Sequence, residues 1–285
     1  METTAYGTGL FVMRKEYLTH MMRSPVTIVG NLFAFKHVIR QMIKSDIKGR
    51  FAGSVGGLLW NFIHPIIMLL VYLFVFVYVF KLRIGEGALM SAMYIMAGLF
   101  PWIILAEGLS SGTVCLIQNA NLIKRTAFPV EILPTKSVLA PFFSIGFALV
   151  VLALYQVVSQ GFPAILVIIP FLAVIQACFT LALAFLASTI SVYFRDMVHL
   201  VQILISFWIF LTPILYPVSM LPDWAKKAMY INPIYPLVAI YQSVLLTGKV
   251  GPLRMPLLAL AWTLGFFLVG SFVFNKLKYE FADWL

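Results

Sequence analysis

Long stretches without a charged side chain dominate the hydrophobic pattern of this chain. Between Lys136 and Arg195 no Asp, Glu, Lys or Arg occurs over 58 consecutive residues. A single helix of that length would extend about 87 Å, whereas the hydrocarbon core of a bilayer is only about 30 Å thick. The run therefore has to turn back inside a membrane, and residues 159–163 (SQGFP) have the composition of a turn. This pattern predicts an all-α polytopic membrane protein.

The same pattern predicts six transmembrane helices. They are expected over residues 58–80, 89–109, 137–158, 163–192, 197–216 and 256–274. Pro101 should kink the second span. With a cytoplasmic N-terminus, 14 of the 20 Lys and Arg residues fall in inside segments and six in outside segments, which favours cytoplasmic N- and C-termini. The expected organisation is a cytoplasmic segment (1–57), a transmembrane domain (58–274) and a cytoplasmic tail (275–285).

No cleavable signal peptide is expected, because the first long apolar run begins only near residue 58. The first span would then serve as an uncleaved insertion signal.

One amphipathic segment predicts a helix that lies along the membrane surface. Over residues 35–48, apolar side chains recur at the spacing of one helix face. The basic side chains of this segment are Lys36, Arg40, Lys44 and Lys48, and Arg50 follows them. Such a helix places its apolar side in the acyl boundary and its basic side against lipid phosphates.

A second short apolar segment predicts a re-entrant hairpin. Residues 236–247 (PLVAIYQSVLLT) are too few to cross a bilayer. A short helix is expected over residues 222–230, and Asn232 with Pro233 should break the chain before the apolar segment. The two pieces would form a helical hairpin on the outer side, within residues 218–255.

Composition and missing motifs narrow the function. Apolar residues make up 62% of the chain and charged residues 11%, against about 25% charged in soluble domains. The net charge of +10 does not indicate nucleic acid, because the basic residues flank apolar segments instead of forming one stripe. Cys115 and Cys178 form no disulfide framework or metal motif. No phosphate-binding loop or hydrolase motif occurs, so neither catalysis nor a bound cofactor or metal is expected on this chain.

Glu107 is the one ionisable residue expected inside a span, near its inner end. Intramembrane carboxylates are candidates for function, but Glu107 could also face the cytosolic interface. An ion-coupled secondary carrier usually needs more such groups, and a membrane-embedded enzyme acting on lipid-linked sugar needs a catalytic cluster. Both remain weaker alternatives.

Several short strings appear in an order typical of one family. Residues 50–60 (RFAGSVGGLLW) precede His64 and Pro65, and residues 128–134 (FPVEILP) precede the third span. Residues 193–196 (YFRD), 211–217 (LTPILYP) and 221–224 (LPDW) follow, and then Asn232 with Pro233. In this order the chain resembles the membrane subunit of ABC-2 type polysaccharide exporters, the permeases for O-antigen, capsule or teichoic acid, and it looks closest to the O-antigen exporters.

The resemblance implies an assembly in the bacterial inner membrane. Two copies of the chain would bind two separate ATP-binding-cassette ATPases, which hold ATP and Mg, and would export a lipid-linked polysaccharide amid membrane lipids. The loop at 115–136 would couple to the ATPase through Asn119, Asn121, Leu122, Lys124, Arg125 and Phe128. Arg195 and Asp196 form a charge pair in an inner loop, where anchoring of the topology is an equally good explanation.

Aromatic residues make up 15% of the chain, and many fall in the middle of predicted spans. Aromatic rings with polar tips can stack on sugars, and weak repeated contacts would let a polymer slide. The predicted channel residues are Tyr72, Trp102, Phe142, Trp208 and Tyr216, with lipid-facing or packing roles as the alternative. The resemblance also makes the hairpin an outer gate, with Pro222, Trp224, Asn232 and Pro233.

Overall fold

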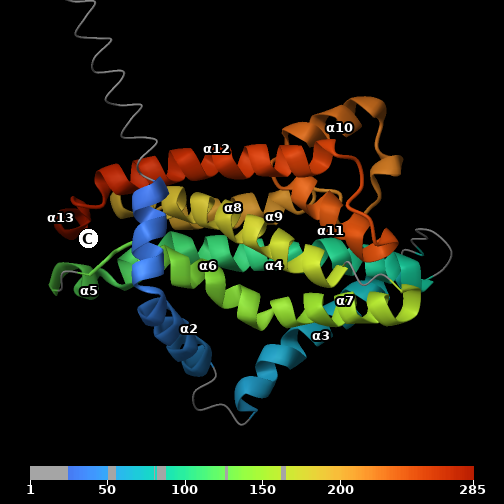
Figure 1. Cartoon of the computed structure of the whole chain (residues 1–285), viewed down its shortest axis with the longest axis horizontal. Coiled ribbons are helices and arrows are strands. Elements are labelled where there is room, and N and C mark those ends of the chain that lie inside the picture. Colours follow the sequence, from blue (N-terminus) through green and yellow to red (C-terminus); the bar gives the residue numbers. More distant parts are fainter. Residues whose placement is uncertain (1–24, 51–55, 80, 82–87, 126–127, 162–164) are drawn as a thin grey trace, which may run out of the picture.

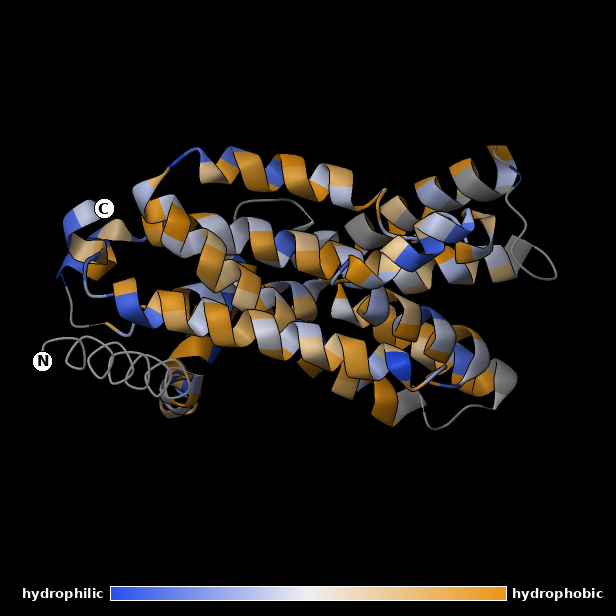
Figure 2. Cartoon of the chain, turned by 90° about the horizontal axis from the view of Figure 1, so that it is seen from above, coloured by the Kyte–Doolittle hydropathy of each residue, from blue (hydrophilic) through white to orange (hydrophobic). Residues whose placement is uncertain are grey.

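The computed structural model describes residues 25–50, 56–79, 81, 88–125, 128–161 and 165–285. Within these ranges every regular element is a helix. The long helices lie side by side as a bundle (Figure 1), and most of their length has hydrophobic colouring in Figure 2. The short helices α5 (Ala120–Arg125) and α13 (Phe281–Trp284) lie at one end, and α10 (Asp223–Ala228) lies toward the other.

Three helices of the described ranges are long and apolar enough to cross a bilayer. They are α4 (Ala88–Gln118), α8 (Ile165–Tyr193) and α12 (Arg254–Leu277). Counting two bent helix pairs raises the number to five. The first pair is α6 (Ile132–Ser144) and α7 (Gly146–Gln160), bent by 41°, and the second joins Asp223–Ile231 to α11 (Tyr235–Thr247) at 106°. A multi-pass helical protein is therefore confirmed, and six full spans stay a prediction.

The remaining predicted spans are less regular. The first corresponds to α3 (Trp60–Leu73), which follows a 3₁₀ turn at Gly57–Leu59 and continues as a π-helix over Phe74–Val79. The fifth corresponds to α9 (Met197–Trp208), which ends eight residues before the predicted boundary at 216. The helix cannot continue because Thr212 precedes Pro213, which disfavours helical geometry and supplies no N–H. Short 3₁₀ turns at Val218–Met220 and Met229–Ile231 complete this outer region.

The turn within the long uncharged run lies where the sequence predicts it. α7 ends at Gly161, whose φ of 68° is left-handed, and the Gly161 N–H donates to the Val157 carbonyl at 3.1 Å. A glycine adopts this conformation without the steric cost of a Cβ. The break between the third and fourth predicted spans is therefore confirmed.

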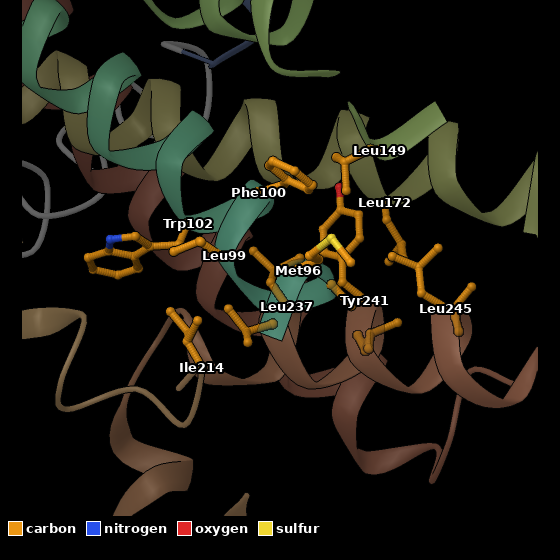
Figure 3. Close-up of a cluster of buried hydrophobic side chains, with 14 of the residues drawn as sticks. Met96, Leu99, Phe100, Trp102, Leu149, Leu172, Ile214, Leu237, Tyr241 and Leu245 are labelled. Atoms are coloured by element: carbon orange, nitrogen blue, oxygen red, sulfur yellow. The ribbon is translucent and has the colours of Figure 1, made fainter. Parts of the chain in front are cut away.

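α11 is a largely buried helix at the same end of the bundle as α10. Figure 3 shows Leu237, Tyr241 and Leu245 of α11 facing side chains of α4, α7 and α8. A Cβ at Gly98 of α4 would lie 2.8 Å from Gln242 Nε2, so glycine permits the close approach of α4 and α11. The hairpin segment is thus part of the core, and its depth in the membrane stays a prediction.

α2 (Lys36–Arg50) follows a short apolar helix, Pro25–Ala34, and packs on α6. Its Ile39 and Ile43 are buried in one cluster with Ile132 and Ala140 of α6. The amphipathic pattern expects these isoleucines to enter the acyl boundary, but α6 offers an apolar protein surface at the same place. The basic residues Lys36, Arg40, Lys44 and Lys48 are exposed, and the side chain of Arg50 lies outside the described part.

Candidate functional site

The predicted coupling loop is a short helix held rigidly at one end of the bundle. Asn119 links α4 to α5 because its side-chain Nδ2 donates to the Cys115 carbonyl at 2.7 Å. The Asn119 carbonyl accepts from the backbone N–H groups of Leu122 and Ile123 at 3.0 and 3.2 Å. Asn119, which is partly exposed, therefore joins the end of α4 to the start of α5, and its role in coupling stays a prediction.

The other predicted coupling residues fall into two groups. Asn121, Lys124 and Arg125 are exposed on α5, although residues 126 and 127 after them lie outside the described part. Leu122 and Phe128 are partly buried and pack on the bundle's own apolar cluster. One face of the loop thus packs against the protein, and the opposite face exposes two cations and an amide.

The C-terminal segment packs beside α5. The sequence interpretation treats this segment only as a tail. The Tyr193 hydroxyl donates to Glu280 Oε2 at 3.1 Å, and the rings of Tyr193 and Trp284 lie 5.1 Å apart. Phe281 is fully buried below them. Because α13 also packs against α5, the chain end extends the same surface.

The inner loop between α8 and α9 adds exposed groups to this end. Phe194, Arg195 and Asp196 are all exposed. Arg195 and Asp196 make no ion pair with each other or with another described residue. The backbone N–H groups of His199 and Leu200 both donate to the Asp196 carbonyl at 3.0 Å, so a tight turn fixes the pair in position.

A buried ion pair and a hydrogen bond to one carboxylate join three segments of the chain. Glu131, whose side chain is only 2% exposed, lies 3.4 Å from Lys278 Nζ at the end of α12. Asn31 Nδ2 of the N-terminal helix donates to the same carboxylate at 2.5 Å. Removing one partner of a buried pair strands the other charge. The sequence interpretation does not single out Glu131, although a carboxylate inside the proline-bounded string at 128–134 was a visible signal.

Three predicted channel or intramembrane residues line one cavity. This cavity of about 220 Å³ is bordered by Tyr72 of α3 and by Trp102 and Glu107 of α4, with apolar side chains completing the wall. A carboxylate beside two aromatic rings combines hydrogen-bond acceptors with faces for stacking on sugars. Trp102 itself is buried, so in this conformation its ring serves packing as well.

A chain of contacts leads from this cavity to the hairpin. The rings of Trp102 and Trp208 meet edge to face with centroids 5.8 Å apart. Trp208 Nε1 donates to Asn232 Oδ1 at 2.9 Å, and Asn232 Nδ2 donates to the Thr212 hydroxyl at 3.0 Å. Two predicted channel residues and one predicted gate residue are therefore in direct contact.

The other predicted channel and gate residues make different contacts. Phe142 packs between two apolar clusters of the bundle, and the Tyr216 hydroxyl donates to the Phe210 carbonyl at 2.8 Å. Trp224 on α10 is 73% exposed. Pro222 is exposed and Pro233 is partly buried.

α9 carries polar groups on an exposed face, which the sequence interpretation missed. Gln202 and Ser206 are exposed, Gln202 Nε2 donates to the Ser110 hydroxyl of α4 at 2.7 Å, and Ser206 Oγ donates to the Gln202 carbonyl at 2.8 Å. The exposed surface of α9 is otherwise apolar, with Leu200, Ile203, Leu204 and Phe207 each more than half exposed. Gln202 and Ser206 are therefore two hydrogen-bonded polar groups on a largely apolar surface.

Candidate metal ligands do not gather anywhere in the described ranges, where no group of three or more His, Cys, Asp or Glu side chains is found. Cys115 and Cys178 are both free thiols.

Comparisons with known proteins point to one family. The family model described as ABC-2 type transporter matches residues 37–246. The O-antigen export system permease protein RfbA of Myxococcus xanthus is 29% identical over 262 residues, which cover 90% of this chain and 99% of the relative. Two proteins of the same name from Klebsiella pneumoniae are 30% and 28% identical, each over 90% of this chain and 96% of the relative.

Proposed function

Because the chain belongs to the ABC-2 type transporter family, we propose that it is the permease subunit of an O-antigen exporter. Two copies form the membrane unit, and two separate ATPase subunits bind beneath it. The complex lies in the bacterial inner membrane with both chain ends in the cytoplasm. ATP hydrolysis on the partner drives a lipid-linked polysaccharide outward, so this subunit is not an enzyme by itself.

The observation that supports O-antigen as the substrate is the name shared by three relatives. These relatives match this chain over nearly their whole length. Each is an O-antigen export permease, and each match covers 90% of this chain. A match of this extent includes the coupling loop, the bundle and the hairpin together, which supports the same transport task and not only a similar helix bundle.

The coupling surface is the exposed face of α5 with its neighbours at that end. Lys124 and Arg125 offer cations, while Phe194 and Trp284 offer exposed aromatic rings. Arginine and aromatic side chains are enriched at protein interfaces. The buried pair of Glu131 and Lys278 supports transmission of force, because it ties the segment after α5 to the end of α12.

The substrate path lies on the side of α3 and α9, where the second copy would close it. Two exposed polar side chains of α9 support this assignment, since Gln202 and Ser206 would contact water and sugar along the path. The cavity at Tyr72, Trp102 and Glu107 opens the path inside each copy. The hairpin of α10 and α11 acts as the outer gate, with Asn232 at its bend.

Deletion of the gene in its native host tests the substrate. The expected result is loss of long-chain O-antigen from lipopolysaccharide gels, restored by the permease gene together with the ATPase gene. Intact O-antigen with loss of capsule or of teichoic acid would instead assign the chain to another polysaccharide exporter of the same family.

A further inference from the structure

A second and larger cavity lies away from the proposed substrate path. This groove has a volume of about 640 Å³ and is formed where α2 crosses α6 and α8. It shares no lining residue with the cavity at Tyr72 and Trp102. A ligand in this groove would therefore differ from a substrate in the proposed path.

The walls of the groove are apolar stripes on two neighbouring helices. α8 contributes Val174, Ala177, Cys178 and Leu181, which recur at the spacing of one helix face. Val174 is 60% exposed and Cys178 is half-buried, so the stripe is not covered by the chain's own packing. A surface of this kind is complementary to a hydrocarbon chain.

The rim of the groove is basic. Lys36, Arg40 and Lys44 line it and follow one another at four-residue intervals, so they form one column along α2. All three are exposed, and none has a carboxylate within ion-pair distance in the described part of the chain. The nearby Asp46 is already paired with Lys136 at 2.9 Å.

Among the described residues no acidic side chain lines the groove, so the three cations beside its apolar walls are not neutralised by the lining. An amphipathic molecule with one negative headgroup and a hydrocarbon tail satisfies both features, because cations near a membrane surface attract anionic lipids. We propose that the groove binds one anionic phospholipid, with an acyl chain along α8 and its phosphate beside Lys36, Arg40 and Lys44. Under the proposed orientation, with both chain ends in the cytoplasm, this phospholipid would belong to the inner leaflet. Binding of the phospholipid to the groove does not depend on that orientation.

Cys178 reports on occupation of the groove without any engineered label. The permease is purified with its ATPase in mild detergent, and a small uncharged thiol reagent is added during titration with phosphatidylglycerol or phosphatidylethanolamine of matched acyl chains. Peptide mass spectrometry measures modification of Cys178, and the buried Cys115 serves as the internal reference. We expect phosphatidylglycerol to slow the modification at least about tenfold, and phosphatidylethanolamine to slow it less than about twofold.

A charge variant tests the rim. Lys36→Gln, Arg40→Gln and Lys44→Gln together should raise the half-protecting concentration of phosphatidylglycerol by up to about 100-fold, since each cation near an anionic lipid contributes about fivefold. The matched control combines Lys227→Gln, Lys249→Gln and Arg254→Gln, three exposed cations outside α2 that do not line the groove. This control should leave protection unchanged.

Five outcomes would overturn the proposal. The first four are equal protection by both phospholipids, undiminished protection in the charge variant, no protection by either lipid, and protection that appears on dimer assembly without lipid. Tighter protection by a polyprenyl diphosphate than by phosphatidylglycerol would also overturn it, because the groove would then hold the lipid anchor of the substrate. The experiment measures protection of Cys178 and not O-antigen export. A wrong proposed function and a wrong lipid site would therefore give different results.

Discussion

At the scale of single residues, the hydrogen bond from Trp208 to Asn232 links the ring pair of Trp102 and Trp208 to the hairpin. Trp208→Phe removes the donated hydrogen bond and keeps an aromatic ring. A matched change exists in α12, where Trp262 Nε1 has no hydrogen-bond partner among the described residues. Trp208→Phe should therefore destabilise the protein by about 1 kcal/mol more than Trp262→Phe does.

Thermal unfolding of both variants in detergent measures this difference. A gap of about 2–4 °C between their midpoints is expected for a chain of this size. Equal midpoints would mean that the hydrogen bond to Asn232 contributes nothing to stability.

Replacing Glu107 tests whether ATP or an ion gradient drives transport. If the ATPase partner drives transport, Glu107→Gln should keep export within about twofold of the native rate, because one neutralised carboxylate does not remove the ATP-driven step. The measurement is the rate of O-antigen appearance in cells with normal levels of the complex. Complete loss of export with intact assembly would favour an ion-coupled carrier or a membrane enzyme.

At the scale of helices, glycine decides how closely α8 and α12 approach. A Cβ at Gly270 would lie 2.5 Å from the Ala182 carbonyl oxygen, whereas a Cβ at Gly265 of the same helix meets nothing within 4 Å. Gly270→Ala should destabilise the protein by about 1–3 kcal/mol through overpacking. Gly265→Ala should be neutral or stabilising by up to about 1 kcal/mol, because alanine favours the helix.

The opposite signs of these two changes make the comparison sharp. Denaturation in mixed micelles, followed by circular dichroism, gives both free energies of unfolding. Similar losses for both variants would show that glycine content, and not the close approach of α8 and α12, matters at these positions.

The short helix α5 should behave as an interface element. Lys124→Ala with Arg125→Ala should weaken binding of the ATPase about tenfold at low salt, and the difference should shrink as salt screens the charges. Lys227→Ala with Lys249→Ala removes two exposed cations outside α5 and should leave binding unchanged. Pull-down titrations at two salt concentrations measure this, and equal effects of the two variants would exclude α5 as a charged contact.

At the scale of the whole molecule, the side of the bundle that contains α9 should be accessible to water in the assembled complex. In a background with Cys115 and Cys178 replaced, Ser206→Cys should react with a charged, membrane-impermeant thiol reagent in the assembled complex. Leu264→Cys, on the exposed apolar side of α12, should stay unreactive because acyl chains cover it. The reverse pattern would place the polymer path along α12.

The surface at the coupling end also has to be considered as a whole. The helices α5 and α13 and the end of α8 are far apart in sequence but lie near one another at one end of the bundle (Figure 1). No local pattern brings these segments together. The sequence interpretation therefore identifies Lys124 and Arg125 as contacts but misses Glu131 and the packing of α13.

The sequence by itself determined the membrane-spanning helical class, the break at Gly161, the amphipathic helix and the positions of exposed cations on α5. These features depend on local composition, on periodicity and on the cost of burying charge in lipid. Only the tertiary structure decided that Ile39 and Ile43 pack on α6, that α9 ends at Trp208, and that Trp208 meets Asn232. Such contacts join residues distant in sequence, and their geometry depends on how closely helices can pack, which residues such as Gly98 and Gly270 govern.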